Sequence, residues 1–340
     1  MRRRRVLALV GEGARPPRSL KGLSDEKVSE FKMEYDVIAA LETIGHEVEC
    51  LEASYDLAKI REGIEKFQPH IVFNMLEDFH GHVVFDQNVV AYLELLRMPF
   101  TGCNPRGLVL SRDKALTKKI CRYHRIPAPR FRVFPRGRKA RALKRLAFPL
   151  IVKSLQEDAS LGISQASLVQ NQEQLTERVR FVHEQVPDDA IAEEYIDGRE
   201  LYLGILGNTR LQTFPIWELN MEKLPDGVPR IATARMKWNL KFQRKYNIRT
   251  RAAKDLPEGV AARIERIGKR VFRLLNLSGY ARLDFRLRED GEVFLLEANA
   301  NPDLSSDEDF SLSAAAAGLS YEELIKRIVS LGMRYHASWD

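Results

Sequence analysis

Short apolar runs alternate with longer stretches of helical spacing through the first 110 residues. The run at residues 6–10 ends at Gly11 and has the length of a buried parallel strand. Residues 26–44 place apolar side chains every three or four positions and stop at Gly45, which is typical of a helix. The predicted elements are strands at 6–10, 48–51 and 71–74 and helices at 26–44, 57–67 and 89–96. This order predicts an α/β domain with a parallel sheet.

The pattern changes after Pro127 and Pro129, which mark a boundary behind a predicted helix at 114–123. Short apolar strands then follow one another with few helices between them, which indicates an α+β unit with an antiparallel sheet. The predicted elements are strands at 131–134, 150–153, 164–170, 190–194, 200–206 and 211–216, a basic helix near 138–145 and a helix at 172–185. The turn at 206–210 makes a hairpin of the last two strands.

The segment 220–251 is polar and has no clean period. A segment of this length without regular structure is usually a functional lid or disordered. An amphipathic helix is predicted at 260–275 and a further helix at 321–331.

A predicted hairpin between these two helices carries the clearest chemical signal. Two apolar strands flank the turn at Asp290-Gly291. Asp284, Glu297 and Asn299 alternate with apolar neighbours, so their oxygens can converge on one side of the sheet. Such hard oxygen ligands suit Mg²⁺, which binds a few carboxylates together with nucleotide phosphates. The hairpin therefore predicts a protein that handles ATP.

Composition and charge narrow the class of protein. The 340 residues are 44% apolar and 30% charged, which suits two or three globular domains. The net charge of +7 fits nucleic acid or an anionic small substrate such as ATP. No RNA-binding motif or zinc-knuckle spacing is present, so we expect no nucleic-acid partner. The unpaired Cys50, Cys103 and Cys121 fit reduced thiols. The first apolar run is too short to cross a membrane, so we expect a soluble cytoplasmic protein.

Three other motifs are ambiguous when each is taken alone. Lys153 ends an apolar strand and precedes the small-residue loop 154–162, which suits phosphate binding or a lysine that merely reaches solvent. The stretch 193–200 suits either a nucleotide base and ribose or a polar turn. Gly11-Glu12-Gly13 follows a strand, but the sixth position is Pro16 and no helix starts there, so a dinucleotide loop is disfavoured.

The order of these motifs resembles that of the ATP-grasp ligases, and within them the D-alanine–D-alanine ligases. The resemblance covers nearly the whole chain. The motifs that carry it are Phe100-Thr101-Gly102, Asp113-Lys114, Phe148 to Lys153, Glu194 to Glu200, Gly279 to Asp284 and Leu296 to Asn299.

The resemblance implies a three-domain ATP-grasp fold that combines α/β and α+β parts. The domains would be a parallel-sheet pre-ATP-grasp domain at 1–110, a central subdomain at 111–205 and a C-terminal subdomain at 206–340 with the mobile lid 220–251. ATP would lie between the last two. A homodimer through the first domain is also implied, with small-molecule carboxylate and amine substrates and no membrane partner.

The resemblance also implies a role for each site residue. Lys114 and Lys153 would contact phosphates, with Lys237 of the lid at the terminal ones. Asp284, Glu297 and Asn299 would bind two Mg²⁺ ions, or Mn²⁺ in their place. The adenine would lie among Glu193, Glu194, Tyr195, Ile196 and Leu296, and the ribose on Glu200. Arg282, with Ser160 and Lys237, would be catalytic, and Arg282 would stabilise charge that develops at the reacting carboxyl.

The implied chemistry is amide formation through an acyl phosphate. A carboxylate attacks the γ-phosphate of ATP, an amine then attacks the resulting carbonyl, and phosphate leaves. Positioning and charge neutralisation carry this reaction. No protein nucleophile is needed, which fits the lack of a Ser/His/Asp or Cys/His arrangement.

The chain departs from the family pattern where the amino acids bind. The family's two adjacent serines are Ala159-Ser160 here, and the lid tyrosine position matches Trp238, so a hydroxyl-to-hydroxyl contact cannot form. Asp303 replaces a glycine and Glu308 lies near an expected serine, where they would repel a free carboxylate and suit a cationic group.

The first domain departs from the pattern as well. The family's early glutamate, which holds an ammonium group, has only Glu26 and Glu30 as candidates, because the spacing is longer here. His80 and His82 replace a glycine-rich acidic loop, where they could touch substrate or metal but are more simply exposed loop residues.

Three functional hypotheses follow. The first is an ATP-dependent carboxylate–amine ligase whose acceptor is not free D-alanine. The second is a true D-alanine–D-alanine ligase of cell-wall synthesis with an unusual pocket. The third is a nucleotide-binding protein without catalysis, which the retained Arg282, Asp284, Glu297 and Asn299 disfavour. The identity and stereochemistry of both substrates stay open at this point.

Overall fold

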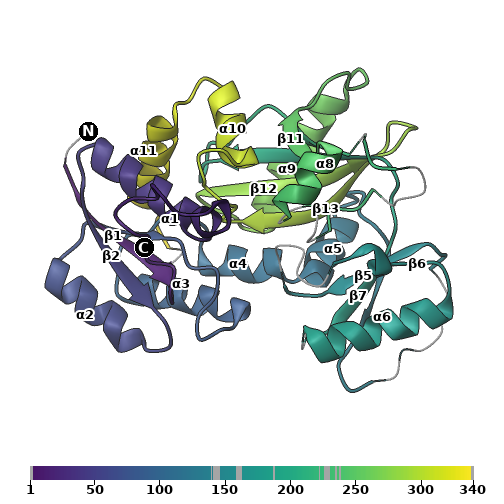
Figure 1. Ribbon diagram of the computed structural model, residues 1–340, viewed down its shortest axis with the longest axis horizontal. Helices are drawn as coiled ribbons and strands as arrows, with labels where there is room; N and C mark the ends of the chain where they lie inside the picture. The colour runs from purple at the N-terminus through teal and green to yellow at the C-terminus, as the bar shows by residue number, and fades with distance from the viewer. Residues whose placement is uncertain are drawn as a thin grey trace.

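The computed structural model describes residues 3–138, 140, 146–157, 163–186, 188–221, 223–225, 230–233, 236 and 239–337. Within these residues the strands form three sheets, which we name the N-terminal, central and C-terminal sheets (Figure 1). No helix in the described residues is both long and apolar enough to span a bilayer.

The N-terminal sheet is parallel, with the strand order β2-β1-β3, which confirms the predicted α/β domain. Its elements are β1 (Arg5–Gly11), α1 (Asp25–Thr43), β2 (Glu47–Ala53), α2 (Leu57–Phe67), β3 (Ile71–Asn74), the 3₁₀ turn η1 (Val83–Phe85) and α3 (Asp86–Leu95). Two further helices, α4 (Pro105–Arg112) and α5 (Lys114–Tyr123), lead out of this unit. No helix begins at Gly13, since α1 starts only at Asp25, as expected for a chain without a dinucleotide loop.

The central sheet is antiparallel, in the order β4-β7-β5-β6, with α6 packed against it (Figure 1). Its elements are β4 (Phe131–Phe134), β5 (Leu150–Ser154), the 3₁₀ turn η2 (Gln165–Ser167), β6 (Leu168–Val169), α6 (Gln172–Gln185) and β7 (Ala190–Glu194). The strand predicted at 164–170 is thus a short turn followed by a two-residue strand. Most of the predicted helix 138–145 lies outside the described residues.

The C-terminal sheet runs β11-β10-β8-β12-β13, and β9 pairs with β8. Its strands are β8 (Arg199–Leu206), β9 (Gln212–Thr213), β10 (Trp217–Asn220), β11 (Arg249–Ala252), β12 (Tyr280–Leu287) and β13 (Val293–Ala300). The helices of this part are α8 (Leu240–Tyr246), α9 (Val260–Leu274), α10 (Asp309–Ala316) and α11 (Tyr321–Gly332). The predicted β8–β9 hairpin is confirmed, with Leu206 opposite Gln212.

Three features of this arrangement differ from the sequence prediction. The strand assigned to the central unit at 200–206 is β8, which pairs with β12 and β10 instead. It is buried along almost its whole length, and a strand buried on both faces carries no local sign of its partner. The segment 220–251 is not wholly irregular, since it contains α8 and most of β11. Helix α11, which the resemblance places in the C-terminal subdomain, packs beside α1 and β3 of the N-terminal unit (Figure 1).

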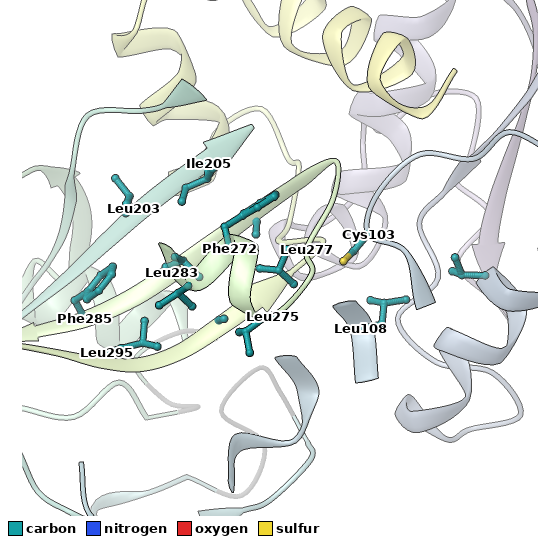
Figure 2. Close-up of a cluster of buried hydrophobic side chains, with 14 of the residues drawn as sticks. Cys103, Leu108, Leu203, Ile205, Phe272, Leu275, Leu277, Leu283, Phe285 and Leu295 are labelled. Carbon is teal, nitrogen blue, oxygen red and sulfur yellow. The ribbon is translucent and has the colours of Figure 1, made fainter. Parts of the chain in front are cut away.

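One apolar core joins the N-terminal unit to the C-terminal sheet. Figure 2 shows Leu203 and Ile205 of β8 with Leu283 and Phe285 of β12, next to Phe272 of α9. The same cluster continues through Cys103 and Leu108 to the N-terminal strands. The central sheet has a separate core, which in the described residues includes Leu150, Val152, Leu175 and Val179.

The junction between the N-terminal unit and the hairpin is tight. The Gly102 carbonyl oxygen lies 2.5 Å from where a Cβ of Gly279 would stand, and Gly279 has φ of +71°. The amide of Cys103 donates to the Asn301 side chain at 2.7 Å. Only a residue without a Cβ fits this approach.

Replacing Gly279 by alanine tests that junction. Gly279→Ala should lower the free energy of unfolding by about 2–4 kcal/mol, because the left-handed φ and the clash with Gly102 add. Gly291→Ala is the matched control: its φ is +82° but nothing lies within 4 Å of the added Cβ, so it should cost only about 1 kcal/mol. Urea denaturation measures both, and equal losses would contradict the close approach.

Candidate functional site

The site is built on the face of the C-terminal sheet opposite α9. In the β12–β13 ladder Asp284 is opposite Glu297 and Arg282 is opposite Asn299, so all four side chains share this face. The Asn299 amide donates to Asp284 Oδ2 at 3.0 Å. A register shift between Asp284 and Phe285 marks a β-bulge, a feature that often re-aims side chains beside active sites.

This donor set fits a divalent metal. Two carboxylates and one side-chain amide lie on the same face of adjacent strands, a set of groups that suits Mg²⁺ bound partly by nucleotide phosphates. No group of three or more His, Cys, Asp and Glu side chains arranged for a metal occurs among the described residues. The face therefore fits an ion that takes its remaining ligands from substrate and water, and not a closed structural metal site.

Arg282 is held between two aspartates. Its Nε and Nη2 donate to Asp284 at 2.8 and 3.0 Å, and its Nη1 lies 3.1 Å from Asp309. The guanidinium stacks 4.7 Å above the centre of the Tyr202 ring. Burial opposes the charge, but Asp284 and Asp309 outweigh it and raise the pKa of Arg282. The arginine stays charged, and its position is fixed by both partners.

A buried chain of ion pairs connects the central sheet to the hairpin. Lys118 of α5 lies 3.0 Å from Glu193 of β7, and both side chains are almost wholly buried. Lys153 of β5 lies 3.5 Å from Glu193 and 3.8 Å from Glu297. Burial works against ionisation of Glu193, but the two lysines outweigh it and lower its pKa. Glu193 is thus a buried anion shared by two lysines.

Sequence reasoning missed Lys118. Its ammonium also donates to the Leu296 carbonyl at 2.7 Å, next to Glu297. A signal was available, because Lys118 follows Lys114 by four residues and so lies on the same face of α5. Lys114 is buried as well and donates to the Glu157 carbonyl at 2.7 Å, at the start of the predicted phosphate loop.

The residues predicted for the nucleotide base and ribose lie around the link between β7 and β8. Tyr195 and Ile196 are half-buried, and Glu194 pairs with Arg130 at 2.7 Å. Glu200 is buried and accepts hydrogen bonds from Tyr202 at 2.9 Å and Arg286 at 2.7 Å. Arg286, also missed, holds this carboxylate in place.

A cavity of about 360 Å³ opens beside Glu200. Its described lining includes Gly198, Glu218, Arg230, Arg251 and Lys254. None of the residues predicted to bind metal lines it. The cavity therefore lies at the Glu200 end of the site and not beside Asp284, Glu297 and Asn299.

A group of acidic side chains lies on the side of Arg282 that faces Asp309. We call Glu34, Asp303 and Glu308 the acidic cluster. Glu34 belongs to α1, Asp303 follows β13, and Glu308 is the N-cap residue of α10. Burial raises the pKa of Glu34 to about 7, and repulsion from Glu77 and Asp303 adds to the shift. Dehydration, with repulsion from Asp303 and Asp309, raises the pKa of Glu308 to about 7.

Other residues that were predicted to bind substrate do not lie in the acidic cluster. Glu26 and Glu30 are exposed, and Glu30 pairs with Lys27 at 2.7 Å, whereas Glu34 one turn further is buried. His80 and His82 are exposed, and their rings lie with Tyr55 and Phe85 in an aromatic group. Ser160, Lys237 and Trp238 lie outside the described residues.

Comparisons with known proteins agree with this geometry. A family model described as "D-ala D-ala ligase C-terminus" matches residues 120–330. An uncharacterised protein, y4sG, of Sinorhizobium fredii is 32% identical over 308 residues, with 88% of this chain and 86% of that protein covered. The D-alanine–D-alanine ligase of Bordetella petrii is 32% identical over 257 residues, with 74% and 73% covered.

A solved structure shares the fold over almost its whole length. It is the D-alanine–D-alanine ligase from Bacillus anthracis complexed with ATP, with a TM-score of 0.75, 22% identity, and 97% and 98% of the two chains covered. The family match over more than half of the chain and the 32% identity to the Bordetella petrii ligase settle the assignment. The chain belongs to the D-alanine–D-alanine ligase family of ATP-grasp enzymes, which are ATP-dependent ligases that form C–N bonds.

Proposed function

We propose that this protein is a carboxylate–amine ligase that works through an acyl phosphate and whose amine acceptor is not free D-alanine. The observation that carries the proposal is the group of carboxyls around Arg282. Asp309 already pairs with this arginine at 3.1 Å, and Asp303 and Glu308 lie close enough to feel its charge. The carboxylate of a free amino acid would meet net negative charge here.

The nucleotide end keeps the features that the family chemistry needs. ATP would lie between the central sheet and the hairpin, with Lys114 and Lys153 at its phosphates and Glu200 at its ribose. Glu193, Glu194, Tyr195, Ile196 and Leu296 would surround the adenine, and Lys237 and Ser160 would complete the phosphate side. Asp284, Glu297 and Asn299 would hold two Mg²⁺ ions. When bound, these ions would neutralise phosphate charge during transfer.

The residues of the chain then position two successive attacks. A donor carboxylate attacks the γ-phosphorus of ATP, the bond to the bridging oxygen of ADP breaks, and an acyl phosphate forms. A neutral amine attacks its carbonyl carbon, and inorganic phosphate leaves with the C–O bonding electrons. Arg282, fixed by Asp284 and Asp309, presents its guanidinium to the oxyanion of the tetrahedral intermediate. The amine proton passes to phosphate or solvent.

A true D-alanine–D-alanine ligase is the second candidate, and the names of the relatives favour it. A phosphate-release screen of amino acids, amines and small peptides with ATP and Mg²⁺ separates the candidates. We expect turnover with acceptors other than D-alanine. Rapid turnover with D-alanine alone would establish the second candidate, and nucleotide binding without turnover for any acceptor would indicate a non-catalytic protein.

The metal assignment has a direct test in Glu297. Glu297→Ala should lower kcat/KM by roughly 100-fold or more, since charge stabilisation by a metal ion is worth several kcal/mol. Glu292→Ala, which changes an exposed glutamate at the turn of the same hairpin, should leave kcat/KM unchanged. Steady-state phosphate release over a range of Mg²⁺ concentrations measures both. Near-normal turnover of Glu297→Ala at ordinary Mg²⁺ would show that the assignment is wrong.

Lys118 should be required for both stability and nucleotide affinity. Lys118→Met leaves Glu193 with one lysine and removes the hydrogen bond to the Leu296 carbonyl. We expect the free energy of unfolding to fall by about 3 kcal/mol, as for other broken buried pairs, and the KM for ATP to rise. Lys119→Met is the control, because that side chain is exposed on the next position of α5. Identical melting curves for the two variants would refute the role.

A further inference from the structure

We propose that the acceptor is an amine carrying a second, protonated amino group in place of a carboxylate, and that Glu34, Asp303 and Glu308 bind that second group. The inference rests on the proposed function, since it names the substrate class of the same site. It follows from charge compensation around Arg282, from a buried carboxyl without a partner, and from the convergence of three elements.

The first step is that, in the part of the chain that the structure describes, the cations nearest this place already have carboxylate partners. Arg282 makes two hydrogen bonds with Asp284 and pairs with Asp309, so its single charge faces two carboxylates. Lys32 of α1, the nearest described lysine in sequence to Glu34, pairs with Asp36 at 2.5 Å and Asp307 at 3.4 Å. A carboxylate entering here would gain no uncompensated partner among the described residues and would be repelled by the acidic cluster.

The second step concerns Glu34. Its residue surface is only 8% exposed, yet its carboxyl has no hydrogen bond or ion pair with another residue in the described part of the chain. A buried carboxyl without a partner is costly, and a cation that pairs with it removes much of that cost. Glu34 is therefore a carboxyl that a cationic group of a ligand would stabilise.

The third step is that three separate elements bring their carboxyls to this place. Asp303 is near enough to both Glu34 and Glu308 to raise the pKa of each. Glu308 occupies the N-cap position of α10, and its side chain makes no capping hydrogen bond. The groups that also face the cluster are Glu77, Asp307, Asp309, Tyr280, Tyr321 and Arg282. The two cations beside them in the described residues both have carboxylate partners: Arg282 pairs with Asp284 and Asp309, and Lys32 pairs with Asp36 and Asp307.

The chemistry of a diamine suits this arrangement. One amino group, neutral, attacks the acyl phosphate beside Arg282, and a C–N bond forms as the C–O bond to phosphate breaks. The other amino group keeps its proton and lies among the three carboxylates. Only the neutral amine reacts, so the cluster also selects which end of the acceptor is acylated.

Calorimetric titration of the full chain with Mg²⁺ and a non-hydrolysable ATP analogue tests the proposal. The probes are 1,3-diaminopropane, propylamine and D-alanine at pH 7, each in phosphate and in Tris. We expect the diamine to bind at least tenfold more tightly than propylamine. Its apparent enthalpy should differ between the buffers, because a bound cation expels protons from Glu34 and Glu308, whose pKa values are near 7. D-alanine should bind most weakly.

Single substitutions test whether the acidic cluster causes the tighter binding of the diamine. Glu34→Gln and Glu308→Gln should each weaken diamine binding about tenfold and reduce proton release, while propylamine binding stays the same. Glu42→Gln is the control, because Glu42 is an exposed residue of the same helix. Equal binding of diamine and propylamine, or no effect of Glu34→Gln, would overturn the proposal.

Failure of this inference differs from failure of the proposed function. ATP-dependent phosphate release with a neutral or carboxylated acceptor, but not with the diamine, would overturn the cationic acceptor and leave the ligase intact. Absence of phosphate release with every amine would overturn the ligase itself.

Discussion

The register of the β12–β13 hairpin is the constraint on which the site depends. It places Asp284 opposite Glu297 and Arg282 opposite Asn299 on one face. On the other face, Leu283, Phe285 and Leu295 are buried against α9 (Figure 2). A slip of one residue would exchange the faces, so the apolar core that holds Phe285 also fixes the face on which the Asp284 and Glu297 carboxylates lie. The apolar face thus orients the chemical face without touching substrate.

Buried charges in the site are compensated by linked ion pairs, and a bound nucleotide would compete with these pairs. Lys153 lies near both Glu193 and Glu297, so a phosphate that approaches Lys153 competes with carboxylates already present. Metal binding to Glu297 would relieve that competition, because the carboxylate then has another cation. Nucleotide and metal should for this reason bind cooperatively, since each provides the partner that the other displaces.

Local pattern was enough to predict the parts of the site that lie close together in sequence. The hairpin and its turn at Gly291 follow from local pattern, whereas the shared face of Asp284 and Glu297, with Leu295 on the other face, depends on the β-bulge in the ladder. Pattern could not predict the pairing of β8 with β12, because a strand buried on both faces shows no preference for a partner. The sequence does not favour Glu34 over Glu26 and Glu30, because the burial of that turn of α1 depends on contacts with residues more than 250 positions away.

The division of the core separates the acidic cluster from the buried lysines of the central sheet. The central sheet, with Lys153 and Glu193, has a core of its own. The N-terminal unit, with Glu34, shares a continuous core with the C-terminal sheet, and α11 packs against α1. Substitutions at Asp303 or Glu308 would therefore act within one packed body, close to Arg282. Arg282 joins two groups of side chains: Asp284 ties it to the hairpin face that carries Glu297 and Asn299, and Asp309 ties it to the acidic cluster. Because Asp309 compensates the arginine from outside the β12–β13 hairpin, the charge beside Arg282 can be altered there without disturbing the hairpin register.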